Sequence, residues 1–295
     1  MKLINQSFEI ITQTPGIDGI YKHIEKAGRT CYKSEDKITE DSAKKFVDML
    51  TNAKHGAMLE HGTVYLYIEF TSPLADKNFL RYSKIKHKYS ANKYSKVVNK
   101  LIDNYKTQCY ITTNLRVLVE NNWLDDLQYI CEPTEHHAKR VTVRFTTDQG
   151  VLREFTRHRV FSFACESTRY CNYSKDKFNN EITFIIPNWV PLNEQRILTD
   201  SFGAALKDFD VLSDFIYSLG AAERTYFRLL NLGWKPQQAR NVLPLATKCD
   251  LVMTGFVEDW SGFFELRCST AAHPQAKELA DNLKQEFIKL GIYEG

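Results

Sequence analysis

The chain has 295 residues and a net charge of +3 at neutral pH, with 43% hydrophobic and 25% charged residues. That length allows one large domain or two modest ones, and so small a charge does not by itself indicate a nucleic-acid or membrane partner. The sequence contains no run of about 18 apolar residues, so we expect no membrane span. Its polar N-terminal stretch does not resemble a signal peptide.

The seven cysteines are scattered, odd in number and without a CxxC pair. A disulfide framework and a structural zinc site are therefore not expected, and we predict no metal site. This usage of cysteine favours a reducing, cytoplasmic location.

Apolar periodicity predicts the elements of the N-terminal third. Residues 3–11 alternate weakly and predict a first strand. A helix is predicted from about Asp41, with Thr39 as its cap. The clearest strand is Thr63–Phe70, in which every second residue from Val64 onward is apolar.

The remaining elements follow from the same patterns. Strands are predicted at Val141–Thr147, 181–187 and Leu251–Phe256, and helices at Val151–Arg159, 204–232, 259–267 and 274–290. Gly233 is suited to end the long helix, and Pro236 to open the next. Strands and helices alternate without a regular βαβ rhythm, and neither common glycine-rich phosphate loop is present.

The segment from Ser72 to Arg140 stands apart in composition. Between Lys84 and Lys100 it holds six lysines interleaved with tyrosines. Such a pattern is compatible with an anion-binding or nucleic-acid-binding surface. The interpretation that we favour is a solvated insertion, because runs of charge are usually exposed faces.

Residues 153–170 combine arginines, one histidine, two glutamates and hydroxyl side chains with apolar residues. This mixture predicts arginines drawn into a partly buried pocket, where guanidinium groups need carboxylate or phosphate partners. A buried ion-pair network without a ligand is the alternative. Consecutive helical residues diverge by roughly 100°, so Arg157, His158 and Arg159 cannot all face one small ligand. Either the helix ends there or these side chains serve different ligands or subunits.

This stretch resembles a known signature. Arg157-His158-Arg159, seven residues and then Ser167 are similar to the RHR-x7-S motif of the flavin-dependent thymidylate synthases. Further blocks fall in the family's order: Glu60-His61 before a strand, Arg240 to Pro244, Leu266-Arg267 and His273-Pro274-Gln275. The chain departs from the family at Ala164-Cys165, where Asn-Glu is common. Either Cys165 or the following Glu166 takes the place of that glutamate.

The resemblance implies an α/β fold of α+β type, with a mainly antiparallel sheet flanked by helices. It implies a single domain over residues 1–295 with an insertion at about 72–140. It also implies reductive methylation of dUMP to dTMP, with methylenetetrahydrofolate as carbon donor and FAD reduced by NADPH as hydride source. The family uses no cysteine nucleophile and forms homotetramers with shared active sites.

Site residues are carried over from the family block by block. The residues implied to bind FAD are His61, Thr63, Arg157, His158, Arg159 and Cys165. The residues implied to bind dUMP are Glu154, Arg157, Cys165, Glu166, Ser167, Thr168, Arg169, Arg240 and Arg267. Arg267 and Ser167 are the predicted catalytic residues, with Arg267 stabilising negative charge on the pyrimidine.

Other interpretations of these residues stay open. Arg240 could form a structural ion pair, Arg267 could complement a helix dipole, and His61 could be a core histidine. His273 is as compatible with a structural role as with a flavin contact. Cys165 and Cys171 lack the neighbours that activate a nucleophile, so we predict apolar fillers. Alternative functions are a flavin-binding homologue that has lost methyl transfer and a nucleic-acid-binding protein that uses Lys84–Lys100.

Overall fold

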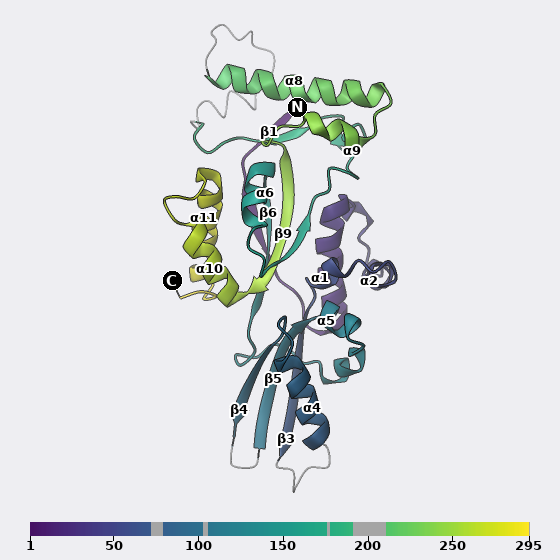
Figure 1. Cartoon of the computed structure of the whole chain (residues 1–295), viewed down its shortest axis with the longest axis vertical. Coiled ribbons are helices and arrows are strands. Elements are labelled where there is room, and N and C mark those ends of the chain that lie inside the picture. The colour runs from purple at the N-terminus through teal and green to yellow at the C-terminus, as the bar shows by residue number, and fades with distance from the viewer. Residues whose placement is uncertain (72–78, 103–105, 176–177, 191–210, 295) are drawn as a thin grey trace.

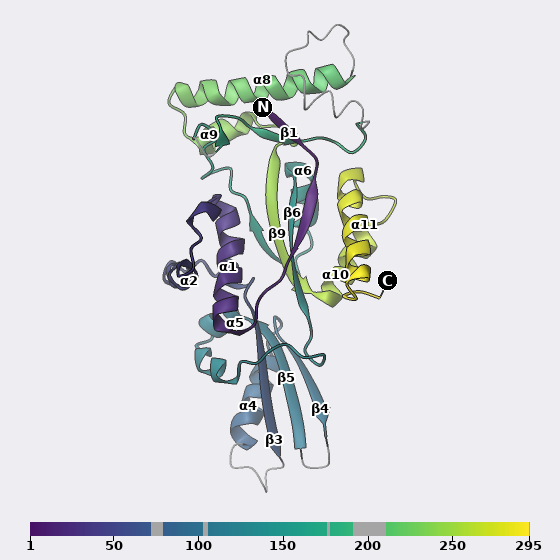
Figure 2. The ribbon, with the colours of Figure 1, turned by 180° about the vertical axis from the view of Figure 1, so that it is seen from behind.

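The computed structural model describes residues 1–71, 79–102, 106–175, 178–190 and 211–294. The molecule is elongated, with three layers of structure following one another along its long axis (Figure 1). A four-stranded sheet lies in the middle, a three-stranded sheet lies at one end, and a long helix crosses the other end (Figures 1 and 2).

The central sheet has the order β2-β6-β9-β7, and all its neighbours are antiparallel. Its strands are β2 (Ser7–Ile11), β6 (Arg140–Asp148), β9 (Lys248–Phe256) and β7 (Ser162–Cys165). Helices lie on both sides of it (Figures 1 and 2). They are α1 (Gly16–Tyr32) and α2 (Ser42–Asn52) on one side, and α6 (Gln149–Phe155), α10 (Val257–Arg267) and α11 (Pro274–Lys289) on the other.

The two faces of β9 make different contacts, because successive strand residues point to opposite faces. Leu251 and Met253 belong to an apolar cluster that also takes in residues of α6, α10 and α11, among them Phe155, Trp260 and Phe287. Gly255 shares this face, and a Cβ there would lie 2.5 Å from the Phe161 ring. The other face of β9, which bears Lys248, Asp250 and Thr254, makes the polar contacts of the candidate site.

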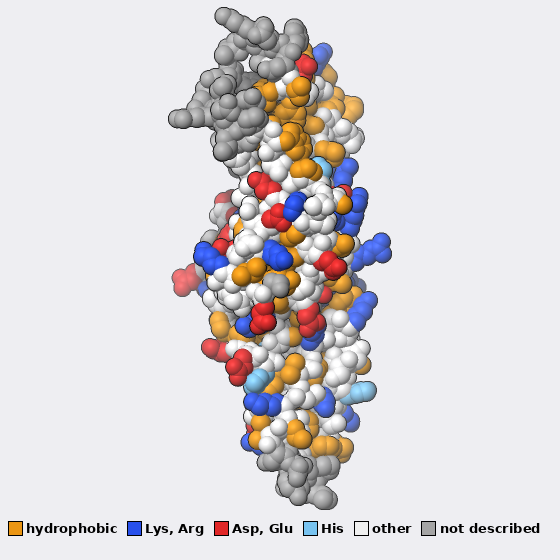
Figure 3. Space-filling view, turned by 90° about the vertical axis from the view of Figure 1, so that its left-hand side faces the viewer, with side chains coloured by type: hydrophobic (Ala, Val, Ile, Leu, Met, Phe, Trp, Pro, Cys, Tyr) orange, Lys and Arg blue, Asp and Glu red, His pale blue; other side chains and the backbone are white. Residues whose placement is uncertain are grey.

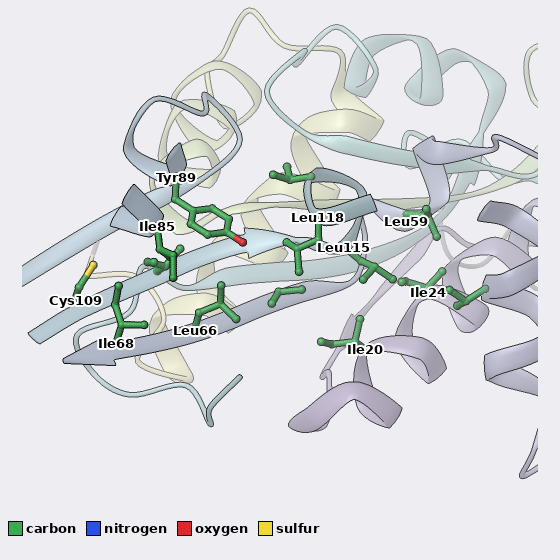
Figure 4. Packing of buried hydrophobic residues seen from close by; sticks show 14 of the residues in the cluster. Ile20, Ile24, Leu59, Leu66, Ile68, Ile85, Tyr89, Cys109, Leu115 and Leu118 are labelled. Atoms are coloured by element: carbon green, nitrogen blue, oxygen red, sulfur yellow. The ribbon is translucent and has the colours of Figure 1, made fainter. Parts of the chain in front are cut away.

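The outer sheet has the order β3-β5-β4 and is also antiparallel. Its strands are β3 (Thr63–Thr71), β4 (Lys96–Leu101) and β5 (Lys106–Asn114). Its apolar face packs against α4 (Phe79–Ser90) and α5 (Leu115–Glu120). Figure 4 shows that this core reaches from Tyr89 of α4, past Leu66 of β3, to Ile20 and Ile24 of α1. The alternation predicted for Thr63–Phe70 is confirmed.

The described part of the segment after Ser72 is thus folded: lysines of its charged run face solvent, as expected for such a run, while apolar residues between them are buried. Ile85 and Tyr89 are buried, while Lys84 faces solvent on the same helix. Tyr89 donates to the carboxylate of Asp126 (2.8 Å), which also pairs with Lys88 (2.5 Å). The apolar spacing within the lysine run therefore outweighs its charge in deciding the local structure.

The third layer joins the N-terminus to later segments. β1 (Lys2–Ile4) pairs in parallel with β8 (Thr183–Ile185). The long helix is α8 (Val211–Asn231), followed by α9 (Pro236–Ala239). The remaining short elements are α3 (Gly56–Leu59) and the 3₁₀ helices η1 (Glu35–Lys37), η2 (Leu124–Tyr129) and η4 (Arg240–Val242).

The mixed α/β class with antiparallel sheets flanked by helices is confirmed. Several boundaries differ from the predictions. Residues 3–11 form two strands of different sheets, α2 begins after Asp41 rather than Thr39, and the helix predicted to reach Arg159 ends at Phe155. The first part of the helix predicted at 204–232 lies outside the described residues. No helix in the described part of the chain is both long and apolar enough to cross a bilayer.

Candidate functional site

The Arg157-His158-Arg159 motif lies in the turn between α6 and β7. The side chain of Asp148 caps α6 by accepting a hydrogen bond from the Val151 amide (2.7 Å). The helix ends at Phe155, whose ring is buried in the same apolar cluster as Val151. The three motif residues therefore follow the helix, so helical geometry does not fix the directions of their side chains.

His158 is held by Arg267, the last residue of α10. The Nε atom of Arg267 donates to His158 Nε2 (2.9 Å), and its Nη1 donates to Glu154 (2.8 Å). Arg267 Nη2 also donates to the backbone oxygen of Glu154. Burial, followed by the charge of Arg267, lowers the pKa of His158 to about 4. The imidazole is therefore neutral near pH 7 and accepts from the guanidinium.

Arg157 and Arg159 are more exposed than His158, and Arg157 shares the Glu154 carboxylate with Arg267. The Arg157 side chain is 69% exposed and pairs with Glu154 (3.2 Å), and Arg159 is exposed as well. Two cations thus stand at the surface beside a neutral histidine. Such a surface favours an anionic ligand.

The segment Glu166–Tyr170 follows β7 and is tied to separate parts of the chain. The Ser167 amide donates to the Cys31 oxygen at the end of α1 (2.9 Å). Arg240 Nη1 donates to the Thr168 hydroxyl (3.0 Å), so two predicted nucleotide-binding residues do meet. Arg169 is exposed and lies over the ring of Tyr170 (5.5 Å).

Cys165 and Glu166 occupy different environments. Cys165 packs against the apolar cluster beneath β9, and burial raises the pKa of its thiol to about 11. Glu166 is turned inward, with its side chain 3% exposed and its carboxylate bound by Lys248 (2.8 Å). The predicted contacts of both residues with ligands stay predictions. In this structure the Glu166 carboxylate already has internal partners.

His61 and Thr63 lie where the central and outer sheets meet. His61 is fully buried, and its Nδ1 is 2.8 Å from the Thr254 hydroxyl. Burial, followed by the charges of His23 and Arg140, lowers the pKa of His61 to about 3. Thr63 is hydrogen-bonded through its backbone to the side-chain amide of Gln13. A cavity of about 20 Å³ beside Thr63 and Gln13 has room for one water and not for a nucleotide.

Arg140 was missed by the sequence reasoning, yet it joins these blocks. Arg140 donates to the backbone oxygen of Glu60 (3.0 Å), to the Thr63 hydroxyl (3.2 Å) and to the Ser162 hydroxyl (3.5 Å). Its Nε is buried and has no hydrogen-bond partner among the described residues. No carboxylate of those residues lies within 4.0 Å of it, and burial lowers its pKa to about 10. Only its place at the start of a predicted strand could have suggested it.

A second missed feature is a cluster of charges around Asp250. Asp250 accepts from Lys33, Lys248 (2.6 Å), Arg144 (3.0 Å) and the Thr146 hydroxyl (2.7 Å). The alternating charges of Lys248 and Asp250 in a buried strand were the available signal. In the described residues, no group of three or more His, Cys, Asp or Glu side chains could hold a metal ion.

The predicted flavin residues form two groups within one chain. No hydrogen bond or ion pair within the described ranges joins His61 or Thr63 to Arg157, His158 or Arg159. His273 precedes α11 and packs edge-on against the exposed Trp189 (5.9 Å). Nothing in this placement favours one of its two roles.

Comparisons with known proteins bear on the same blocks. The family described as "Thymidylate synthase complementing protein" matches residues 131–290, more than half of the chain. A flavin-dependent thymidylate synthase from Synechocystis is 27% identical over 150 residues, which are 50% of this chain and 66% of that protein. One from Corynebacterium efficiens is 30% identical over 162 residues, 52% of this chain and 60% of that protein.

A probable flavin-dependent thymidylate synthase of Paramecium bursaria Chlorella virus 1 is 25% identical over 153 residues, again 50% of this chain and 66% of the relative. The chain thus spans just under two thirds of the length of these curated relatives. Among solved structures, a UMP/dUMP methylase from Streptomyces cacaoi bound with 5-Br dUMP has a TM-score of 0.43 and 16% identity. That match covers 98% of this chain and 93% of the other.

Proposed function

The chain belongs to the thymidylate synthase complementing protein family, and from that premise we propose that it is a flavin-dependent thymidylate synthase. The reaction is the reductive methylation of dUMP at C5 to give dTMP. The observation that best supports this proposal is the pairing of Arg240 with Thr168 beside Ser167.

The nucleotide end of the proposed site is built for an anion. Ser167 and Thr168 offer hydroxyl groups, while Arg169 and Arg240 offer guanidinium groups that match phosphate oxygens. These four residues bind the phosphate of dUMP. The exposed guanidinium of Arg169 is the group best placed to meet an incoming ligand.

The flavin end offers cations that lack carboxylate partners. The two cations are Arg159, which is exposed, and Arg140, which has no carboxylate of the described residues within 4.0 Å. His61 is neutral and adds a buried Nε2 atom without a hydrogen-bond partner among those residues. These groups suit the pyrophosphate of FAD. The residues that hold FAD are His61, Thr63, Arg157, His158, Arg159 and Cys165. When bound and reduced by NADPH, FAD supplies the hydride equivalent that no side chain can supply.

Arg267 has donors to spare for the pyrimidine. Three of its five N–H groups bind Glu154 and His158. The remaining two stabilise negative charge at N3 and O2 of the uracil ring, which makes C5 more nucleophilic. The carbon that C5 takes up comes from methylenetetrahydrofolate.

We further propose that the active sites are shared in a homotetramer. No hydrogen bond or ion pair of the described residues joins His61 or Thr63 to Arg157–Arg159, and in a shared site residues of two subunits would complete one flavin pocket. A cytoplasmic location stays a prediction from the cysteine usage.

Nucleic-acid binding through Lys84–Lys100 is not favoured. Lys88 pairs with Asp126 and Lys96 with Glu258, so part of this positive charge is neutralised within the chain. On the face shown in Figure 3, acidic and basic side chains are both present over the middle of the molecule. A surface of mixed sign attracts a polyanion weakly.

The decisive experiment is tritium release from C5-labelled dUMP in the presence of methylenetetrahydrofolate and NADPH. We expect release by the wild-type protein together with a visible flavin absorbance band. Ser167→Ala should reduce release strongly, and Ser90→Ala, an exposed serine on α4, should leave it unchanged. A flavin band without tritium release would favour a homologue that has lost methyl transfer. Salt-sensitive nucleic-acid binding without flavin would overturn the proposal.

A further inference from the structure

The nucleotide-binding segment Ser167–Arg169 has no helix or strand of its own. It leaves the edge strand β7 at Cys165 and lies outside every element of the described chain. A segment of this kind loses conformational entropy when it is ordered, and that cost lowers affinity if binding must order it. What holds the segment before a ligand arrives therefore affects how tightly the ligand binds.

Glu166, the residue just before the segment, forms hydrogen bonds through both its backbone and its side chain. Its backbone amide donates to the Asp250 oxygen (2.8 Å), which extends the pairing of β7 with β9 by one residue. Its carboxylate accepts from Lys248 Nζ (2.8 Å) and from the Asp250 amide (3.2 Å) and lies 3.6 Å from Lys33 Nζ. Both ends of Glu166, backbone and side chain, are thus fixed to β9.

The C-terminal end of α1 holds the same segment from the other side. The Cys31 oxygen accepts from the Ser167 amide (2.9 Å), and the Tyr32 ring packs on the Tyr170 ring (5.5 Å). Lys33 follows in the left-handed conformation (φ 47°), and its ammonium group reaches Glu166 and Asp250. At the end of α1, Cys31 thus contacts the segment itself, Tyr32 contacts Tyr170 just after it, and the C-cap residue Lys33 contacts Glu166 just before it.

The charges around Glu166 balance when the neighbouring Glu35 is included. Lys33, Lys248 and Arg144 face Glu35, Glu166 and Asp250. The side chains of Lys33 and Lys248 are each 15% exposed, and that of Asp250 is 1% exposed. Burial alone would raise the pKa of Asp250, but Lys248, Lys33 and Arg144 together hold it below its usual value. Each of these six side chains thus lies within 4.0 Å of at least one of opposite charge.

A buried ion group is rarely the most stabilising choice, since apolar residues of similar volume are often as good. What it does supply is a fixed direction, because each charged hydrogen bond has one geometry. Here that direction is imposed on the residue that precedes Ser167. The arrangement thus specifies where the segment lies more than it stabilises the fold.

We propose that Glu166, Lys33 and Lys248 are positioning residues that hold Ser167–Arg169 in the conformation that binds the nucleotide phosphate. This inference rests on the proposed function for the identity of the ligand. It assigns Glu166 a role behind the segment rather than against dUMP. Removing the tether should raise KM and Kd for dUMP far more than it lowers kcat, since the reacting groups on Arg267 and the flavin end are untouched.

The test uses the full-length protein with three substitutions of the tether. Lys248→Met removes the cation, and Glu166→Gln/Lys248→Met removes one charge of each sign so that the group stays balanced. Lys248→Arg restores a cation at the same place. Lys44→Met, at a 73% exposed lysine of α2, is the matched control. Each variant is measured for dUMP affinity by calorimetry, flavin binding by absorbance, thermal unfolding, and amide hydrogen exchange of the peptide covering residues 166–171.

We expect Lys248→Met to weaken dUMP binding by about tenfold or more, about 1.4 kcal/mol or more, and to speed exchange in residues 166–171. Flavin binding should be retained. The double variant should recover thermal stability and keep the weak dUMP binding, while Lys248→Arg should recover much of the affinity. Lys44→Met should match the wild type in all four measurements.

Two results would overturn the positioning role. One is unchanged exchange of residues 166–171 in Lys248→Met and in the double variant. The other is recovery of dUMP affinity together with stability in the double variant, which would mean that the charges only support the fold. Failure of the proposed function gives a different pattern: the wild type would not bind dUMP at all, whereas the exchange measurement would still report on the tether.

Discussion

Arg267 Nη1 donates a 2.8 Å hydrogen bond to the carboxylate of Glu154, which lies 113 positions earlier in the chain. The bond joins the end of α10 to α6 just before the Arg157-His158-Arg159 turn. Glu154→Ala should cost about 1.5–3 kcal/mol of unfolding free energy, the usual range for a hydrogen bond to a charged group. Urea denaturation measures this. Glu265→Ala, at an exposed glutamate of α10, should change the value by about 0.5 kcal/mol at most.

Arg140 offers a test of the flavin end. Arg140→Met keeps much of the side-chain volume against Phe256 but removes the donors to Thr63 and Ser162. We expect FAD retention to fall by about tenfold or more, since the loss of one bond to a charged group is worth that much. Arg140→Lys should be intermediate, because an ammonium group cannot reach several acceptors in one plane. Full FAD occupancy in Arg140→Met, read from the flavin band, would show that this guanidinium does not serve the cofactor.

Stability should fall in mild acid because of two buried histidines. Burial, followed by nearby positive charge, lowers the pKa of His23 to about 4, and His61 has a pKa of about 3. In the unfolded chain both histidines titrate at about pH 6.5, so below that pH the unfolded state binds protons that the folded state does not bind. The unfolding free energy therefore keeps the full contribution of both histidines above about pH 6.5. It falls toward pH 4, by at most about 1.4 kcal/mol per pH unit for each histidine.

Urea denaturation at a series of pH values from about 7.5 to about 5 measures this slope. His23→Asn can keep a hydrogen bond to Thr142 but has no proton to gain, so the slope should become shallower. His87→Gln, at an exposed position of α4, should leave it as in the wild type. A wild-type curve that is flat over this range would contradict the burial argument.

Cys171→Ala should retain tritium release within about twofold, because Cys171 is buried in an apolar cluster, where a thiol packs as a small hydrophobic side chain. A modest loss of stability is expected from the cavity, on the order of 1 kcal/mol. Loss of release in a variant that remains folded and binds flavin would show that the thiol takes part in the reaction.

Local patterns predicted those parts of the fold that depend on local physics. Thr63–Phe70 alternates because one face of β3 packs on α4 and α5, so its strand is visible in the sequence. The helix α1 was missed, although Ile17, Ile20 and Ile24 follow helical spacing, because Gly16, Gly19 and Gly28 lower its helix propensity. Its packing against the rest of the core outweighs that propensity.

The candidate site divides in the same way. The blocks around Arg157 and Ser167 could be recognised because their residues are consecutive. Arg140 and Lys33 could not, because their partners lie on other elements, as when Lys33 meets Asp250 217 positions later. Pairings of that kind depend on strand register and helix docking, which no short stretch of sequence specifies.

The strand β9 fixes the distance between its contacts as well as the face that they share. Lys248, which binds Glu166, and Phe256, which lies under Arg140, are eight residues apart on one side of the strand, with Thr254 and its partner His61 between them. At about 3.3 Å per residue, the nucleotide tether and the Arg140 end are separated by about 26 Å. A shift of β9 by one residue would carry both ends to the opposite face at once. A change that loosens this one strand is therefore expected to impair nucleotide and flavin binding together.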